Sequence, residues 1–279
     1  MNYSKNKYKI IFFLFLFIIN FPLWANPEKN ITLPKLLEVS GSLNGISVFL
    51  RQVDLTINQE RITNPEEALS EYEKELYLKD LTYNGIVEKL MIDLGEKLSP
   101  NTQDYLLKLY DLEIIKRQIN AEAESATPEG ITNLTRYFQT LQKTPPSKKK
   151  IRLIHELESA FMATEMSIYS IVSFTRARTE TVLKYRNQWN SENIQKLDYQ
   201  FSKMSDNLEK PTRNQMRMAY LYIYKDFSID ELEELLLHAK DEKRINYTVS
   251  FLDSFNRIVV EGVKKGLLSV LKYREKSET

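Results

Sequence analysis

The chain has 279 residues, and its 39 basic and 38 acidic side chains leave a formal net charge of +1. This near-neutral balance argues against a nucleic-acid partner, because nucleic-acid binders present a strongly basic surface to the phosphates. The absence of cysteine and the presence of only two histidines exclude disulfides, a lipid anchor on cysteine, a cysteine nucleophile, thiolate-bound zinc and any site of three histidines.

The first 25 residues have the pattern of an export signal. Three lysines precede an unbroken apolar run over residues 10–19, and Ala25 ends a region typical of signal cleavage. The apolar run reaches roughly 15 residues when it is extended, whereas a membrane span requires about 20. We expect a signal peptide over 1–25 and a periplasmic or secreted bacterial protein. The alternative is an uncleaved anchor, the one expected membrane contact, because Leu23 is larger than signal peptidases prefer.

Hydrophobic spacing predicts an all-α fold for the mature chain. Apolar residues over 34–58 recur at alternating intervals of three and four, which places them on one stripe of a helix. Only seven glycines occur, and no segment alternates like a strand. We expect a multi-helix bundle of about ten helices, at 34–58, 65–79, 81–97, 100–124, 128–143, 148–187, 192–208, 212–226, 229–241 and 244–273.

Four of these helices begin at recognisable capping sequences. At 64–65, 99–100 and 127–128 a side-chain cap precedes a proline in the first helical position, where the missing amide hydrogen costs nothing. Ser228 and Glu231 have the spacing of a capping box, in which each side chain bonds the backbone amide of the other. We therefore expect helices to start after each of these caps.

Two prolines at 145–146 mark the clearest break, because a residue before proline is pushed away from helical geometry. We expect an N-terminal helical half over 26–146 and a C-terminal helical half over 147–279. At an offset of 98 residues, 131–172 aligns with 229–270, and each stretch predicts a short helix, a charged turn and a long helix. The alternative is that any two amphipathic helix pairs align this well.

Two closely spaced glycine pairs stand out, Gly41 with Gly45 and Gly262 with Gly266. Glycine inside a helix costs up to about 1 kcal/mol relative to alanine, so each pair predicts the close approach of another helix. Packing within the core is the preferred interpretation. A dimer seam is the alternative, which would suit a structural scaffold.

One cluster of side chains is a candidate metal or acid–base site. His155, Glu158, Met162 and Glu165 lie at spacings of three, four and three, which places them on one face of a single helix. An imidazole and a carboxylate three residues apart can share a metal in helical bundles, although the order here is reversed. The alternative is an ordinary polar face, so His155, Glu158 and Glu165 stay candidates, and no catalytic residue, cofactor or metal is assigned.

The sequence contains no nucleophile elbow, no phosphate loop and no dinucleotide-binding glycine motif. It is rich in aromatic residues, with 16 tyrosines and 13 phenylalanines. Such side chains can line a groove for an apolar or peptide ligand, or lie at the rim of the core with their hydroxyls in water.

The stretches 153–172 and 221–267, together with LLEVSG at 36–41, resemble secreted bacterial proteins of an uncharacterised family with a domain of unknown function. The resemblance implies an exported, all-helical protein. It rests on helix caps and core positions, so it implies no catalytic residue.

The leading hypothesis is an exported cell-envelope protein without enzymatic activity that binds an envelope protein or an apolar or peptide ligand through a helical groove. One alternative is a carboxylate- or metal-dependent envelope enzyme with a site near His155 and Glu158. Another is a structural helical scaffold.

Overall fold

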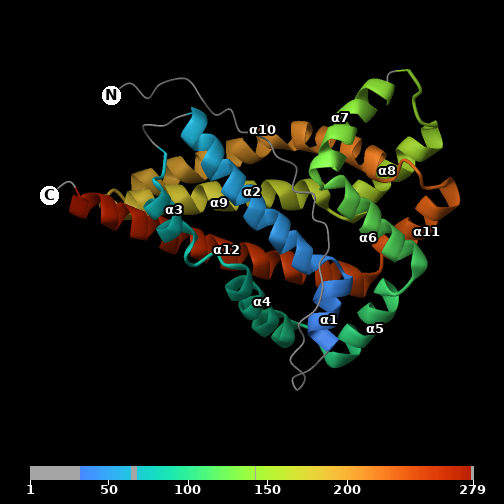
Figure 1. Cartoon of the computed structure of the whole chain (residues 1–279), viewed down its shortest axis with the longest axis horizontal. Coiled ribbons are helices and arrows are strands. Elements are labelled where there is room, and N and C mark those ends of the chain that lie inside the picture. Colours follow the sequence, from blue (N-terminus) through green and yellow to red (C-terminus); the bar gives the residue numbers. More distant parts are fainter. Residues whose placement is uncertain (1–31, 64–67, 142, 278–279) are drawn as a thin grey trace.

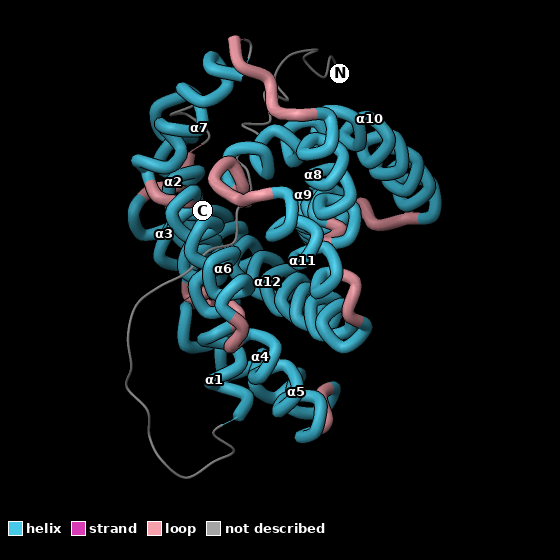
Figure 2. Tube along the Cα trace, turned by 90° about the vertical axis from the view of Figure 1, so that its right-hand side faces the viewer, coloured by secondary structure: helices cyan, strands magenta, loops and turns pink. Residues whose placement is uncertain are grey.

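The computed structural model describes residues 32–63, 68–141 and 143–277. The signal peptide predicted over 1–25 lies outside the described residues, as does the capping sequence at 64–65. Within the described ranges the fold is all-α, as predicted, with twelve helices and no strand (Figure 2). No helix in this part of the chain has both the length and the apolar character needed to cross a membrane.

In chain order the helices are α1 (Thr32–Val39), α2 (Ser42–Thr63), α3 (Glu71–Leu78), α4 (Tyr83–Lys97), α5 (Pro100–Tyr110), α6 (Glu113–Ser125), α7 (Pro128–Leu141), α8 (Lys148–Ala160), α9 (Ala163–Tyr185), α10 (Ser191–Ile223), α11 (Ile229–Ala239) and α12 (Glu242–Ser277). Some consecutive helices pack against each other, such as α8 with α9 and α9 with α10, whereas α3 and α4 pack mainly on the distant α12 (Figure 1).

Three long helices form the centre of the bundle. α9 lies between α10 and α12 and packs along both (Figure 1). α2 crosses this layer, where the ring of Phe49 meets Phe174 of α9 and Phe255 of α12. α3 and α4 pack on α12, while α6, α8 and α11 pack together at the opposite end. Buried apolar residues from both predicted halves join one core, which extends from Leu33 to Val263.

The predicted caps lie where expected in the described part of the chain. The Ser99 hydroxyl accepts a hydrogen bond from the Thr102 amide at 3.2 Å. The Thr127 hydroxyl accepts one from the Gly130 amide at 2.9 Å, and Ser228 forms the predicted capping box at the start of α11. The expectation of a helix over 65–79 is wrong at its start, because residues 68–70 are not helical and a second capping box begins α3 at Glu71.

Three expected helices are each divided. The helix expected over 34–58 breaks at Gly41, whose φ of 83° is accessible to glycine. The helix expected over 100–124 breaks after Tyr110, which lets both Tyr110 and Ile115 be buried. Five residues apart, these two would point in different directions from a straight helix. The helix expected over 148–187 breaks at Met162.

One expected break is absent. The helices predicted over 192–208 and 212–226 form the single helix α10, with Pro211 inside it. Proline removes one backbone hydrogen bond from a helix and costs about 3 kcal/mol or more there. Pro211 faces solvent, so water can reach the carbonyl that loses its partner, while the flanking Leu208 and Thr212 are buried. The packing of Leu208 and Thr212 on either side of Pro211 therefore outweighs the tendency of proline to end a helix.

The second glycine pair brings α12 close to the chain that joins α3 to α4. A Cβ added to Gly262 would lie 2.5 Å from a methyl carbon of Leu81, and one added to Gly266 would overlap the carbonyl oxygen of Tyr77. These glycines serve packing within the core, which was the preferred interpretation. The long helix of the first proposed repeat is interrupted at Met162, whereas α12 is continuous.

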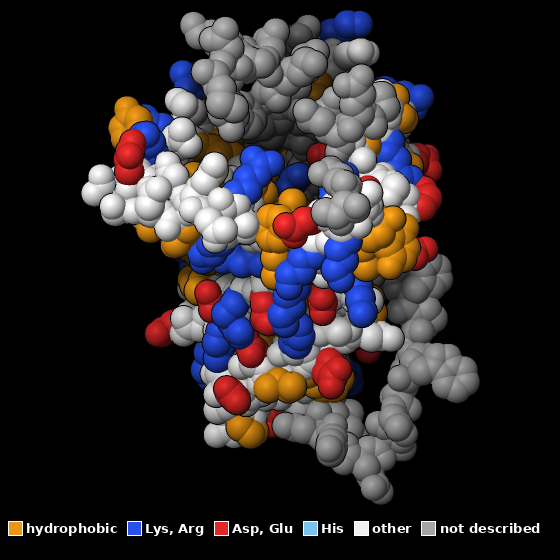
Figure 3. All heavy atoms as spheres, turned by 90° about the vertical axis from the view of Figure 1, so that its left-hand side faces the viewer, with side chains coloured by type: hydrophobic (Ala, Val, Ile, Leu, Met, Phe, Trp, Pro, Cys, Tyr) orange, Lys and Arg blue, Asp and Glu red, His pale blue; other side chains and the backbone are white. Residues whose placement is uncertain are grey.

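Charges of both signs are mixed where the ends of α3 and α12 meet (Figure 3). Lys74 pairs with Asp54, and Arg274 pairs with Glu73, which is buried. The Arg274 guanidinium lowers the pKa of Glu73 to about 2. This face therefore alternates in charge and forms no continuous basic patch.

Candidate functional site

The predicted cluster of His155, Glu158, Met162 and Glu165 does not lie on one helix. His155 and Glu158 belong to α8, and Glu165 belongs to α9. Met162 between them has a φ of 51°, in the left-handed region, so that α9 leaves in a new direction. The prediction of a single helix face is therefore wrong, because regular spacing holds only while the helix is continuous.

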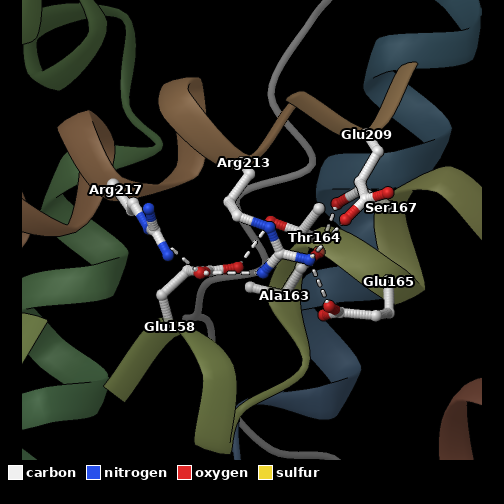
Figure 4. Close-up of polar contacts among 8 residues, drawn as sticks. All are labelled: Glu158, Ala163, Thr164, Glu165, Ser167, Glu209, Arg213 and Arg217. Atoms are coloured by element: carbon white, nitrogen blue, oxygen red, sulfur yellow. Dashed lines mark hydrogen bonds and ion pairs between the residues drawn. The ribbon is translucent and has the colours of Figure 1, made fainter. Parts of the chain in front are cut away.

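Glu158 is fully buried and its charge is compensated by α9 and α10 (Figure 4). The Thr164 hydroxyl donates a hydrogen bond to Oε1 of Glu158. Arg213 Nη1 and Arg217 Nε lie 3.4 Å and 3.5 Å from Oε2 of the same carboxylate. Two cations and a hydroxyl thus hold the buried acid, and the contacts join α8, α9 and α10 across the break at Met162.

The other two candidates lie at the margin of this cluster. Glu165 is exposed and accepts a hydrogen bond from Arg213 Nη2 at 2.7 Å, which raises the pKa of Arg213. Burial, and then the nearby Arg217 charge, lower the pKa of His155, which favours the neutral imidazole. Nowhere in the described residues do three or more histidine and acidic side chains form a group that could hold a metal ion. The cluster connects α8, α9 and α10 through ion pairs and a hydrogen bond.

A cavity of about 200 Å³ lies beside the break and is lined by residues of α2, α5, α6, α9, α10 and α12. Much of its wall is apolar, with Phe161 and Met166 beside the break, Met216 of α10 and Phe251 of α12. We call it the Arg244 cavity, after the one basic side chain among its lining residues. A concave, mostly apolar space with a few polar groups is the usual form of a small-molecule site.

The break between α1 and α2 supplies one polar part of this wall. The Tyr247 hydroxyl lies 2.7 Å from the Ser40 hydroxyl and 2.8 Å from that of Ser42. The sharp turn at Gly41 brings the two serines together. Burial raises the pKa of Tyr247 well above its ordinary value, so the phenol stays protonated. Its hydroxyl therefore contributes to the wall as a hydrogen-bonding group shared with Ser40 and Ser42.

α6 supplies an acid to the same wall. Oε1 of Glu122 accepts hydrogen bonds from Gln118 Nε2 and from the Tyr224 hydroxyl, both at 2.7 Å. Burial raises the pKa of Glu122, although these two bonds and the charge of Arg244 oppose the rise. Glu122 therefore keeps its proton to a higher pH than an exposed glutamate does.

Arg244, in the first turn of α12, is the most unusual group of the cavity. Its side chain is 5 % exposed. Nη2 donates to Oε1 of Gln118 at 2.9 Å, and the guanidinium lies 5.0 Å from the ring centre of Phe161. Nη1 is buried without a hydrogen-bond partner, and no carboxylate of the described residues lies within 4.0 Å of the guanidinium. A buried cation of this kind is costly unless something pairs with it.

Sequence reasoning missed the residues of the cavity. The charged stretch around Arg244 predicts a solvated turn, yet Arg244 lies on the same stripe as the buried Tyr247 and Phe251. A charged residue within a stripe of apolar residues is the signal by which the sequence indicates this site. Gln118 and Glu122 lie four residues apart on α6, as neighbours on one helix face do.

No protein-family model matches the chain, and no curated protein or solved structure is significantly similar to it.

Proposed function

We propose that this protein is an exported, non-enzymatic cell-envelope protein that binds a small, largely apolar ligand in the Arg244 cavity. The observation that carries the proposal is the cavity itself, about 200 Å³ of space bounded by aromatic and methionine side chains and a few polar groups. The pattern of an export signal over residues 1–25 supports the location.

The volume favours a compact ligand. An engineered apolar cavity of about 150 Å³ stays dry and binds benzene, so a cavity of about 200 Å³ accommodates a ring with a substituent or a short chain. Methionine side chains adapt to the shape of a ligand, because they are unbranched and polarisable. Met166 and Met216 both line this space.

The buried tyrosines in and beside the site are suited to hydrogen bonding. Burial raises the pKa of Tyr220 and Tyr224 well above the ordinary value, as it does for Tyr247. Their hydroxyls are therefore protonated at physiological pH and serve as hydrogen-bond donors. Candidates from the sequence, Glu158 and Glu165, are occupied by arginines outside the cavity.

Binding of toluene, a neutral apolar probe, tests the proposal. A ligand that binds only the folded state raises the melting temperature, by about 2–4 °C at roughly ten times its dissociation constant. The test variant is Ser167→Phe, which places a ring in the cavity. The control is Ser269→Phe, since Ser269 is exposed and makes the same bond to the carbonyl four residues before it.

We expect toluene to stabilise the wild-type protein and the Ser269→Phe control, and to have no effect on Ser167→Phe. An absent shift in the wild type, or an equal shift in Ser167→Phe, contradicts the proposal. Circular dichroism at low temperature confirms beforehand that both variants are folded.

A further inference from the structure

The Arg244 guanidinium is incompletely paired inside the protein. Its Nη2 is bonded to Gln118, whereas its Nη1 has no partner. Of the buried side-chain nitrogen and oxygen atoms that lack a partner in the described residues, Nη1 of Arg244 is the one that belongs to a cavity-lining residue. Leaving a charged donor unsatisfied in a buried place costs more than leaving a neutral one, so the site is complete only with an acceptor.

Several other polar groups of the wall already have partners. The Ser167 hydroxyl donates to the carbonyl of Ala163, and the Ser170 hydroxyl donates to Oδ1 of Asn256. The Tyr247 hydroxyl is shared with Ser40 and Ser42. Arg244 is therefore the one charged donor of the wall for the polar end of a ligand, beside the neutral hydroxyls of Tyr110, Tyr220 and Thr248.

Glu122 is the one acidic residue on this wall, and it does not supply the acceptor that the Arg244 guanidinium lacks. Gln118 lies between them, donating through its amide nitrogen to Glu122 and accepting through its amide oxygen from Arg244. The Tyr224 hydroxyl also binds Oε1 of Glu122. This arrangement separates the acid from the guanidinium and leaves Nη1 to an outside partner.

The charge and size of the site decide the class of that partner. Guanidinium groups pair best with carboxylate and phosphate oxygens. A phosphate group carries up to two charges and three acceptor oxygens, which a single cation beside an acid does not satisfy. A carboxylate carries one charge and two oxygens. The apolar wall of Phe161, Met166 and Phe251 then requires that the remainder of the molecule be hydrocarbon.

We propose that the Arg244 cavity binds a small organic carboxylate with an apolar body, whose carboxylate pairs with the guanidinium of Arg244 while the body contacts Phe161, Met166 and Phe251. This inference rests on the proposed function of the same cavity. Two sources have the required chemistry, namely arylalkanoic acids and medium-chain fatty acids.

Matched acids and amides test the inference by isothermal titration calorimetry. Phenylacetate is compared with phenylacetamide, and octanoate with octanamide, because each amide keeps the shape and removes the charge. We expect the wild-type protein to bind one acid at least tenfold more tightly than its amide. The pair with the larger ratio identifies the aryl or the alkyl source.

Two variants assign the preference to Arg244. In Arg244→Gln the acid and the amide should bind equally, while the stabilisation by toluene is kept. Arg244→Lys retains the charge and should recover part of the preference for the acid. Arg152→Gln, which removes a mainly exposed arginine on α8, serves as the control and should bind as the wild type does.

The outcomes separate the two proposals. Toluene binding without any preference for acids overturns the carboxylate inference and leaves the proposed function standing. A preference that survives in Arg244→Gln overturns the role of Arg244. Failure of toluene, the acids and the amides alike overturns both proposals.

Discussion

Two buried charges of this protein lie near the same helix break, and they differ in how they are paired. Glu158 is held by Thr164, Arg213 and Arg217. Arg244 has Gln118 as its hydrogen-bond partner and one donor without any. The Glu158 carboxylate needs no further partner, whereas the Arg244 guanidinium is complete only with a ligand.

This contrast shows that burial and charge alone do not identify a functional site. Removing one partner from a satisfied buried pair is destabilising, because the other partner keeps its charge without compensation. Removing a charge that was never fully paired loses little. Substitution of Glu158 should therefore mainly lower stability, whereas substitution of Arg244 should mainly lower ligand binding. The following variants test this difference.

The largest expected effect is that of Glu158→Ala. It leaves two guanidinium groups facing a buried void, and we expect the free energy of unfolding to fall by about 3 kcal/mol. Part of the cost is relieved because Arg213 and Arg217 are 23 % and 29 % exposed and can turn to water. Urea denaturation measures the change.

Glu165→Ala is the matched control for this variant. Its carboxylate also binds Arg213 but is exposed, so the loss should be about 0.5 kcal/mol or less. Losses of equal size in the two variants would show that burial of Glu158 does not matter. Toluene should still bind to folded Glu158→Ala.

Glu73→Gln removes a second satisfied buried carboxylate, at the other end of α12. The shift of the Glu73 pKa from 4.5 to about 2 corresponds to roughly 3 kcal/mol. We expect a loss of about 2 kcal/mol near neutral pH, since Arg274 is 42 % exposed and solvent screens the pair.

The effect of Glu73→Gln should depend on pH. Because the folded state lowers this pKa, the stabilisation is complete above about pH 4.5 and is lost as the pH falls towards about 2. The difference between wild type and variant should therefore shrink between about pH 5 and pH 3 in urea denaturation. A constant difference contradicts the assignment to the ion pair.

Arg244→Met should change stability little, by about 1 kcal/mol or less in either direction. It loses the hydrogen bond to Gln118 but also removes a buried charge that is costly to desolvate, so the two effects oppose each other. Thermal denaturation without ligand measures it. A loss as large as that of Glu158→Ala would show that Arg244 is as well paired as Glu158.

The smallest expected effect is a pH dependence of carboxylate binding. A bound carboxylate disfavours the charged form of Glu122, whose pKa burial already raises. Affinity should therefore fall as the pH rises through the raised pKa of Glu122 and this group loses its proton. The side chains that influence it are Gln118 of the same helix and, from other elements, Tyr110, Tyr220, Tyr224 and Arg244.

Glu122→Gln provides the comparison for this effect. The variant cannot ionise at this position, so its affinity for the acid should not change with pH. Titration calorimetry over a series of pH values distinguishes the two proteins. An equal slope in wild type and variant would assign the pH dependence to another group.

The helical fold could be predicted because its signals are local. A serine cap bonds an amide three residues away, as at Ser99 and Ser228, and such contacts are visible in a single stretch of sequence. The breaks are less visible. Met162 adopts a left-handed conformation without being glycine, and Pro211 continues a helix because packing on both sides supports it.

The site could not be predicted for a related reason. Gln118 and Arg244 are bonded across 126 positions of the chain. The spacing of His155, Glu158 and Glu165 described one helix, whereas the structure places the last of them on another helix. The one signal of this site that the sequence shows is the charge of Arg244 within a stripe of apolar residues.

The dependence of α3 on α12 has a consequence for the order of folding. α3 packs chiefly on α12, and Tyr77 meets Gly266, close to the other end of the chain. Chains are synthesised from the N-terminus, so α3 lacks its main partner while the ribosome is still at work. The helices made first therefore reach their final packing only after the last one has been made.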